Sequence, residues 1–167
     1  METYKASLDT TSKILTGFIF LFPIFVIVIW KKDSQLSDLV PPFIIIGPLI
    51  IFTYLFRIMS YEITDEKVII KRPISIFDKG IALSGIESVK ILTKEDFSGT
   101  IRTFGNGGLF GYTGYYANDK LGSFRMFATS GKSRILIILK DKKGKIVISP
   151  DDTTMVDALQ KRLNKPA

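Results

Sequence analysis

Hydrophobic residues in this chain of 167 residues are concentrated in two uncharged blocks near the N-terminus. The first block is ILTGFIFLFPIFVIVIW, residues 14–30, and the second is LVPPFIIIGPLIIFTYLF, residues 39–56. As helices they would extend about 26 to 27 Å, close to the hydrocarbon thickness of a bilayer, about 30 Å. A buried core helix would show polar interruptions at helical spacing, and a signal peptide would show a small-residue cleavage site; neither is present. The pattern therefore predicts a hairpin of two transmembrane helices.

The Lys and Arg residues near the ends of these blocks predict the orientation of the hairpin. Six lie on the outer flanks and two in the connector: Lys5, Lys13, Arg57, Lys67, Lys71 and Arg72 against Lys31 and Lys32. Because cytoplasmic loops carry the excess of Lys and Arg, both termini are expected in the cytoplasm. Neither block contains an ionisable residue, which argues against a channel or a transporter.

From Arg57 onward the pattern changes to short strand-like runs. Residues 61–64 and 86–92 alternate apolar and polar residues, and residues 134–140 are the most apolar run and predict a central strand. The runs are YEIT (61–64), KVIIKRP (67–73), ISIFDKGIAL (74–83), IESVKIL (86–92), GTIRTF (99–104), LGSFRMFAT (121–129), RILIILK (134–140) and KIVIS (145–149). They predict a small barrel of about seven strands.

The last segment, SPDDTTMVDALQKRL, residues 149–163, has the spacing of an amphipathic helix. Ser149 is a predicted N-cap, with Pro150 at the first helical position. The apolar stripe of this helix must be buried, and an open end of the bent sheet is the available surface. The sequence thus predicts an N-terminal tail and transmembrane hairpin over residues 1–57, followed by a mainly-β domain with a C-terminal helix over residues 58–167.

The stretch RTFGNGGLFGYTGYYANDKLGSFRMFATS, followed by VISPDDTTMVDAL, resembles the bacterial PH-like (pleckstrin-homology) domain family found in small membrane-tethered proteins. The resemblance covers residues 58–164. It implies a PH-like barrel at the surface of a bacterial cytoplasmic (inner) membrane, and a family with no established chemistry.

The glycine- and aromatic-rich part of this stretch has three possible roles. A phosphate loop is disfavoured, because a dinucleotide fingerprint needs glycine where Phe110 stands and no helix follows. The sequence GKS, residues 131–133, has Met126 where a Walker A motif needs glycine. Glycines could instead allow sharp bends in a barrel whose core the aromatic rings fill. In the third interpretation, the rings and nearby cations contact a partner.

The last two interpretations stay open. The candidate partner or lipid contact residues are Phe110, Tyr112, Tyr115, Tyr116, Lys120, Arg125, Lys132 and Arg134.

The net charge of +7 lies entirely in residues 57–167, which hold 19 Lys and Arg against 12 Asp and Glu. A basic domain is attracted to acidic surfaces. No recognition-helix, RNP or zinc pattern indicates nucleic-acid binding. PH-like domains that bind phosphoinositides resemble one another in having a basic first hairpin. The corresponding turn here, Thr64–Lys67, is acidic, so specific phosphoinositide binding is not expected. Non-specific attraction to anionic phospholipid is still expected.

The chain contains no histidine and no cysteine, so zinc sites and Ser-His or Cys-His pairs cannot form. The sequence predicts no enzyme activity, no catalytic or metal-binding residues and no cofactor. The function hypothesis is a membrane-anchored PH-like scaffold or sensor that binds a protein partner or an anionic lipid surface. The alternative is a structural accessory subunit that oligomerises in the membrane without a ligand.

Overall fold

The computed structural model describes residues 1–28, 40–140 and 144–164. Three α-helices and ten β-strands occur within these ranges. The helices are α1 (Thr10–Val28), α2 (Val40–Leu55) and α3 (Met155–Leu163). The strands are β1 (Glu2–Lys5), β2 (Ser60–Ile63), β3 (Lys67–Lys71), β4 (Lys79–Ala82), β5 (Ile86–Leu92), β6 (Ile101–Gly108), β7 (Gly111–Asn118), β8 (Gly122–Ala128), β9 (Arg134–Leu139) and β10 (Lys145–Ile148).

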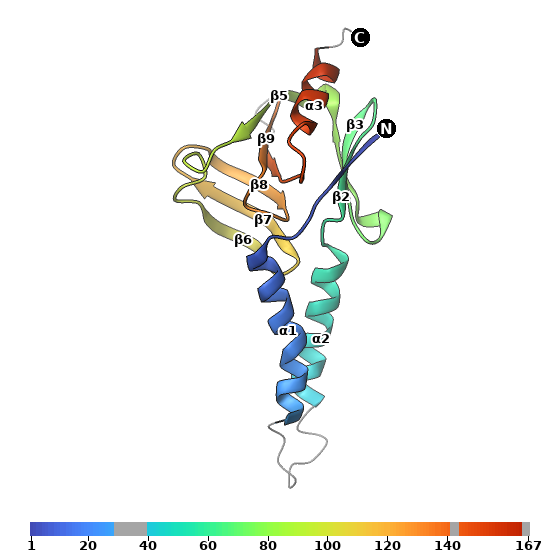
Figure 1. Cartoon of the computed structure of the whole chain (residues 1–167), viewed down its shortest axis with the longest axis vertical. Coiled ribbons are helices and arrows are strands. Elements are labelled where there is room, and N and C mark those ends of the chain that lie inside the picture. Colours follow the sequence, from blue (N-terminus) through green and yellow to red (C-terminus); the bar gives the residue numbers. More distant parts are fainter. Residues whose placement is uncertain (29–39, 141–143, 165–167) are drawn as a thin grey trace.

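The strands form two sheets, with α3 packed beside them and α1 and α2 extending from the same side of the β body (Figure 1). The first sheet has the order β1-β2-β3-β4 and the second β5-β9-β10-β8-β7-β6. Within the two sheets, β10 pairs with β8 in parallel and the other neighbouring strands pair antiparallel. The protein is therefore mainly β, with two sheets and a C-terminal helix.

No helix in the described part of the chain is long and apolar enough to cross a membrane. The first turn of α1 is polar, which leaves residues 14–28, about 22 Å at 1.5 Å per residue. α2 has 16 residues, about 24 Å, and a hydrocarbon core is about 30 Å thick. The predicted transmembrane hairpin is therefore wrong. The predictions that depended on the hairpin are wrong as well. These are the two-span association with a membrane, the inner-membrane location and the cytoplasmic orientation.

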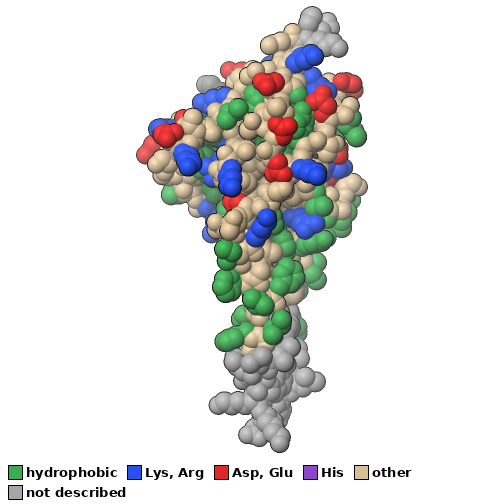
Figure 2. Space-filling model, in the orientation of Figure 1, with side chains coloured by type: hydrophobic (Ala, Val, Ile, Leu, Met, Phe, Trp, Pro, Cys, Tyr) green, Lys and Arg blue, Asp and Glu red, His purple; other side chains and the backbone are tan. Residues whose placement is uncertain are grey.

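The ends of the predicted spans that adjoin the connector, residues 29–30 and 39, and the connector itself lie outside the described residues. The described parts of α1 and α2 expose large apolar side chains, and Figure 2 shows them below a body that carries the charged groups. These side chains are Ile14, Leu15, Phe18, Phe20, Leu21, Phe22, Ile24, Phe25, Ile44, Leu49, Ile51, Phe52 and Tyr54.

The predicted single barrel of about seven strands is also corrected, because the strands form two sheets and three segments differ from the prediction. The N-terminal tail supplies β1, which pairs with β2. The glycine-rich stretch is a hairpin of two eight-residue strands, β6 and β7. Residues 74–83 divide into a 3₁₀ turn, Ser75–Phe77, and the short strand β4. The division of the chain at residue 57 stays a prediction.

The N-terminal segment is also attached to the start of the C-terminal helix. The Ser7 hydroxyl donates to the Asp151 carboxylate at 2.6 Å, and the Asp151 N–H donates to the Lys5 carbonyl at 2.9 Å. α3 starts at Met155 rather than at Pro150, because Ser149 is engaged elsewhere: its buried hydroxyl accepts hydrogen bonds from the N–H groups of residues 129 and 130.

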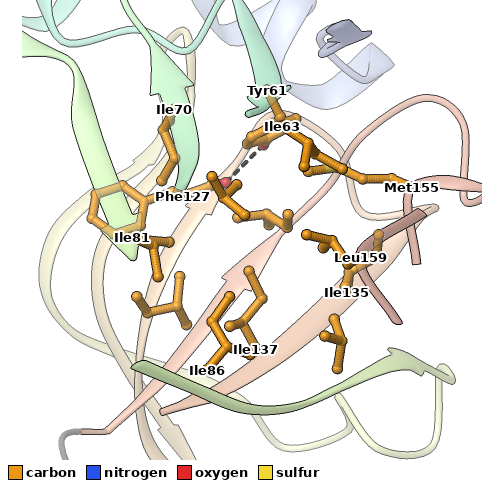
Figure 3. Packing of buried hydrophobic residues seen from close by; sticks show 14 of the residues in the cluster. Tyr61, Ile63, Ile70, Ile81, Ile86, Phe127, Ile135, Ile137, Met155 and Leu159 are labelled. Atoms are coloured by element: carbon orange, nitrogen blue, oxygen red, sulfur yellow. Dashed lines mark hydrogen bonds between the residues drawn. The ribbon is translucent and has the colours of Figure 1, made fainter. Parts of the chain in front are cut away.

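The main hydrophobic core lies between the two sheets and α3 (Figure 3). Met155, Val156 and Leu159 form the predicted apolar stripe of α3, and all three are buried there. Tyr61 of β2 donates a hydrogen bond to the Phe127 carbonyl of β8 across this core at 2.7 Å. A second cluster, which includes Tyr116 and Phe124, covers the opposite face of the six-stranded sheet. This sheet is therefore packed on both faces, and its side-chain alternation decides which residues are left to face solvent.

Candidate binding surface

A groove of about 640 Å³ lies between β4 and the faces of β8 and β10. β4 contributes residues 79–82, β8 contributes residues 123–125, and β10 contributes Lys145 and Ile146. Tyr115 of β7 also lines it. We call this feature the β4–β8 groove. Its volume falls within the range of ligand pockets, about 300–1,000 Å³.

The groove combines an apolar floor with a cationic rim. Ile81 and Ile146 are buried, each 5% exposed. Lys79, Arg125 and Lys145 supply positive charge, and none of the described lining residues is acidic. Such a surface suits a ligand that is partly apolar and negatively charged.

Arg125 is held in the groove by aromatic rings. Its guanidinium carbon lies 5.2 Å from the centroid of the Tyr115 ring and 5.2 Å from that of Phe127. The cause is the strand register, because Arg125 is opposite Tyr115 on β7, and Phe127 is two residues further along β8 on the same face. Cation–π contacts fix the side chain without neutralising it. In the described structure Arg125 has no carboxylate within ion-pair distance.

A second arginine continues this arrangement. The Arg72 guanidinium carbon lies 5.9 Å from the Phe127 centroid and 4.9 Å from that of Phe56, which follows α2. Cations and rings therefore alternate from the end of α2 to β7 in a row that we call the arginine–aromatic row: Phe56, Arg72, Phe127, Arg125 and Tyr115.

The electrostatics of Arg72 reflect this crowding. Burial lowers the pKa of its guanidinium; the nearby Asp78 opposes this shift and the positive charge of Arg125 adds to it. Asp78 itself accepts a hydrogen bond from the Arg72 backbone N–H at 2.8 Å and pairs with the Lys71 ammonium. The Arg72 Nε atom is buried and has no hydrogen-bond partner within the described ranges. A bound anion would stabilise the charge of this partly buried guanidinium.

Only Tyr115 and Arg125 of the sequence-predicted contact residues line the groove. Phe110 is buried at the tip of the β6–β7 hairpin, with its ring centroid 6.2 Å from that of Phe20 and 5.6 Å from that of Tyr54. Its N–H donates to the Thr16 hydroxyl at 3.1 Å. The tip therefore connects the β body to α1 and α2.

Tyr112 and Arg134 lie near Asp9, which precedes α1. The Asp9 carboxylate accepts hydrogen bonds from the Tyr112 hydroxyl at 3.1 Å, the Ser12 N–H at 2.8 Å and the Gly131 N–H at 3.2 Å. Burial raises the pKa of the Tyr112 hydroxyl and lowers that of the Arg134 guanidinium. This cluster attaches the start of α1 to β7 and to the β8–β9 connection.

The remaining predicted contact residues, Tyr116, Lys120 and Lys132, lie outside both the β4–β8 groove and the cluster around Asp9. Tyr116 packs in the second hydrophobic cluster, and its hydroxyl donates to the Asn106 carbonyl at 2.9 Å. Lys120 and Lys132 are exposed in the connections on either side of β8. The glycine-rich stretch thus contains core residues, connecting residues and groove residues.

Sequence reasoning missed two cations of the groove, Lys79 and Lys145, and Arg72 of the arginine–aromatic row. The sequence did contain a signal for the ring contact of Arg125, because alternation along β8 places Arg125 and Phe127 on the same face of the strand. No local signal brings Arg72 to that face, because its ring partners are Phe56, which follows α2, and Phe127 on β8.

A model of the bacterial PH domain family matches residues 59–163, so the chain belongs to this family. The match covers β2 to α3, including the groove. It confirms the family resemblance seen in the sequence. No significant match was found among curated proteins or solved structures.

Proposed function

We propose that this chain is a non-catalytic binding module that holds an acidic segment of a partner protein in the β4–β8 groove. The observation that carries the proposal is the arginine–aromatic row, in which Arg72 and Arg125 are positioned by rings. Membership of the PH domain family supports a binding role in general. The apolar floor favours a polypeptide over a small inorganic anion, because side chains can fill it.

A direct test uses the full chain and a fluorescein-labelled ten-residue peptide that alternates Glu and Val. We expect the peptide to bind at about 0.15 M salt, and a matched peptide with Lys in place of Glu to bind at least tenfold more weakly. Fluorescence anisotropy measures both. Vesicles that contain phosphatidylglycerol form a third arm. If the vesicles bind and the acidic peptide does not, the partner is not a protein segment and the proposal is overturned.

Replacing Arg125 by Glu is expected to weaken binding of the acidic peptide at least tenfold, because it removes a cation from the groove and adds a repelling carboxylate. The matched control is Lys132→Glu, which makes the same change in net charge on an exposed residue outside the groove. It should change the affinity less than threefold. Equal losses in the two variants would indicate general charge attraction and contradict a site at the groove.

A second candidate function is self-association through α1 and α2. The observation in its favour is their exposed apolar surface, on which Phe18 is 66% and Ile51 61% exposed. Monomeric proteins rarely expose large contiguous apolar patches. Sedimentation velocity of the full chain should show an oligomer, and a Phe18→Gln/Ile51→Gln variant should shift it toward the monomer. A wild-type chain that sediments as a monomer at all concentrations tested would exclude this candidate.

A further inference from the structure

The strand β4 forms one wall of the groove and also ends the first sheet. Its hydrogen-bonded neighbour is β3, and the sheet order stops at β4. The opposite side of β4 faces the groove, where residues 79–82 form part of the lining. A sheet edge is thus placed beside the cationic surface described above.

The backbone groups that face the groove follow from the register. The Leu83 N–H donates to the Glu66 carbonyl at 2.8 Å, so these two residues form a hydrogen-bonded pair. Hydrogen-bonded and non-hydrogen-bonded pairs alternate along an antiparallel ladder. Ile81 is therefore bonded to β3, whereas Gly80 directs its N–H and C=O groups, and Ala82 its N–H group, away from β3. The Ala82 carbonyl begins the 3₁₀ turn Leu83–Gly85 and is not an open edge group.

Both outward-facing residues are exposed. Among the described residues, no backbone group outside the helices and strands bonds to Gly80 or to the Ala82 N–H, whereas the Ala82 carbonyl is the N-cap carbonyl of the 3₁₀ turn Leu83–Gly85. Outward-facing N–H and C=O groups of this kind are a template for pairing with another strand. The side chains do not obstruct the edge, since one residue is glycine and the other is alanine.

We infer that the acidic partner segment binds as an extended strand that pairs with Gly80 and Ala82 at the open edge of β4. This inference rests on the function proposed above and specifies how the segment is held. Backbone pairing supplies affinity that is independent of sequence, and side-chain contacts supply the specificity.

The charges around the edge determine which side chains the strand carries. Alternate residues of an added strand point to the same face, about 6.6 Å apart. Residues facing the groove meet Arg125 on β8, Lys79 at the end of β4 and Lys145 on β10. The Lys145 ammonium already donates to the Leu121 carbonyl at 2.6 Å, which positions it at the rim. Carboxylates at alternate positions of the strand would pair with these cations.

The backbone of Ala82 provides a selective way to block the edge. Its φ is −63°, which matches the value that proline imposes, and the preceding residue is extended. Its N–H faces away from β3, so Ala82→Pro removes an outward donor and leaves the β3–β4 ladder intact. The matched control is Ala82→Ser, which changes the side chain and keeps the donor.

The test measures binding of the alternating Glu and Val peptide to the full-length variants by fluorescence anisotropy. We expect Ala82→Pro to weaken binding at least tenfold and Ala82→Ser to leave it within about twofold. A second probe is the same peptide N-methylated at alternate residues, which keeps the side chains and removes the N–H groups along one edge. It should bind the unmodified chain at least tenfold more weakly than the parent peptide.

Three outcomes separate the inference from the proposed function. If Ala82→Pro and the N-methylated peptide bind normally while Arg125→Glu is impaired, strand addition is overturned and the groove function stands. If Ala82→Pro is impaired but its far-ultraviolet circular dichroism or thermal midpoint also changes, the N-methylated peptide decides: normal binding overturns the inference, and weak binding supports it. If no acidic peptide binds the unmodified chain, both are overturned.

Discussion

Replacing Gly114 by alanine is expected to lower the free energy of unfolding by about 3 kcal/mol or more, a large part of the typical 5–15 kcal/mol of a domain. Gly114 on β7 has a φ of +137°, which L-residues with a side chain rarely adopt. It lies opposite Gly105 on β6. A Cβ at Gly114 would also lie only 2.8 Å from the Gly105 Cα and closer still to the Phe104 carbonyl oxygen.

These obstructing atoms belong to the backbone, so they cannot rotate away as the end of a side chain can. The two strands approach each other closely at this pair, and both positions need glycine, since Gly105 also has a positive φ of +114°. Chemical denaturation followed by circular dichroism measures the change. The control is Gly85→Ala, because Gly85 has no positive φ and no atom within 4 Å of an added Cβ. If Gly114→Ala and Gly85→Ala unfold at the same denaturant concentration, the close approach of β6 and β7 is not important for stability.

Removal of the Tyr61 hydroxyl is expected to have the second largest effect. Tyr61 is fully buried, and its hydroxyl donates to the Phe127 carbonyl at 2.7 Å and accepts from the Ser149 N–H at 3.1 Å. Tyr61→Phe leaves this buried carbonyl and N–H without that partner, and an unsatisfied buried group costs about 1–3 kcal/mol. We expect a loss of about 2 kcal/mol in chemical denaturation. The control is Tyr4→Phe, because the Tyr4 hydroxyl donates to the exposed Glu2 carboxylate. This substitution should cost less than about 0.5 kcal/mol.

The same tyrosine predicts a pH dependence. Burial raises the pKa of the Tyr61 hydroxyl well above its ordinary value of about 10. The folded state therefore holds this proton more tightly than the unfolded state does. The resulting stability is fully present below pH 10 and is lost as the pH rises above it. Tyr61→Phe should reduce the slope of stability against pH between pH 10 and 11.5, whereas an unchanged slope would mean that Tyr61 ionises freely in the folded protein.

The effect of the Arg125 and Ala82 substitutions on binding depends on long-range contacts, and the effect of the Gly114 substitution depends on a local one. Features that depend on local contacts could be predicted from the sequence, and features that depend on long-range contacts could not. Residues 134–140 are the most apolar of the strand-like runs and therefore predict a central strand, which is present as β9, between β5 and β10. The tail at residues 2–5 carries no strong strand pattern, and it forms β1 because β2 offers it an edge. Pairing with an existing strand overrode a weak local preference.

The membrane prediction rested on hydropathy alone. Among the described residues, no helix is both long and apolar enough to cross a membrane. The apolar character itself was real, since both helices expose large hydrophobic side chains. Sedimentation velocity of the full chain and of the Phe18→Gln/Ile51→Gln variant tests whether these side chains contact a second copy of the chain.

The sequence by itself determined the PH family, the alternation of most strands and the amphipathic stripe of α3, because these depend on neighbours along the chain. It also determined that the C-terminal two-thirds would be basic. Only the tertiary structure decided which aromatic residue of the glycine-rich stretch joins the core, the helices or the groove. The physical reason is that rings of the same type, such as Tyr115 and Tyr116, point to opposite faces of one strand. Their partners, Arg125 and Asn106, are supplied by strands that the fold places on either side of β7.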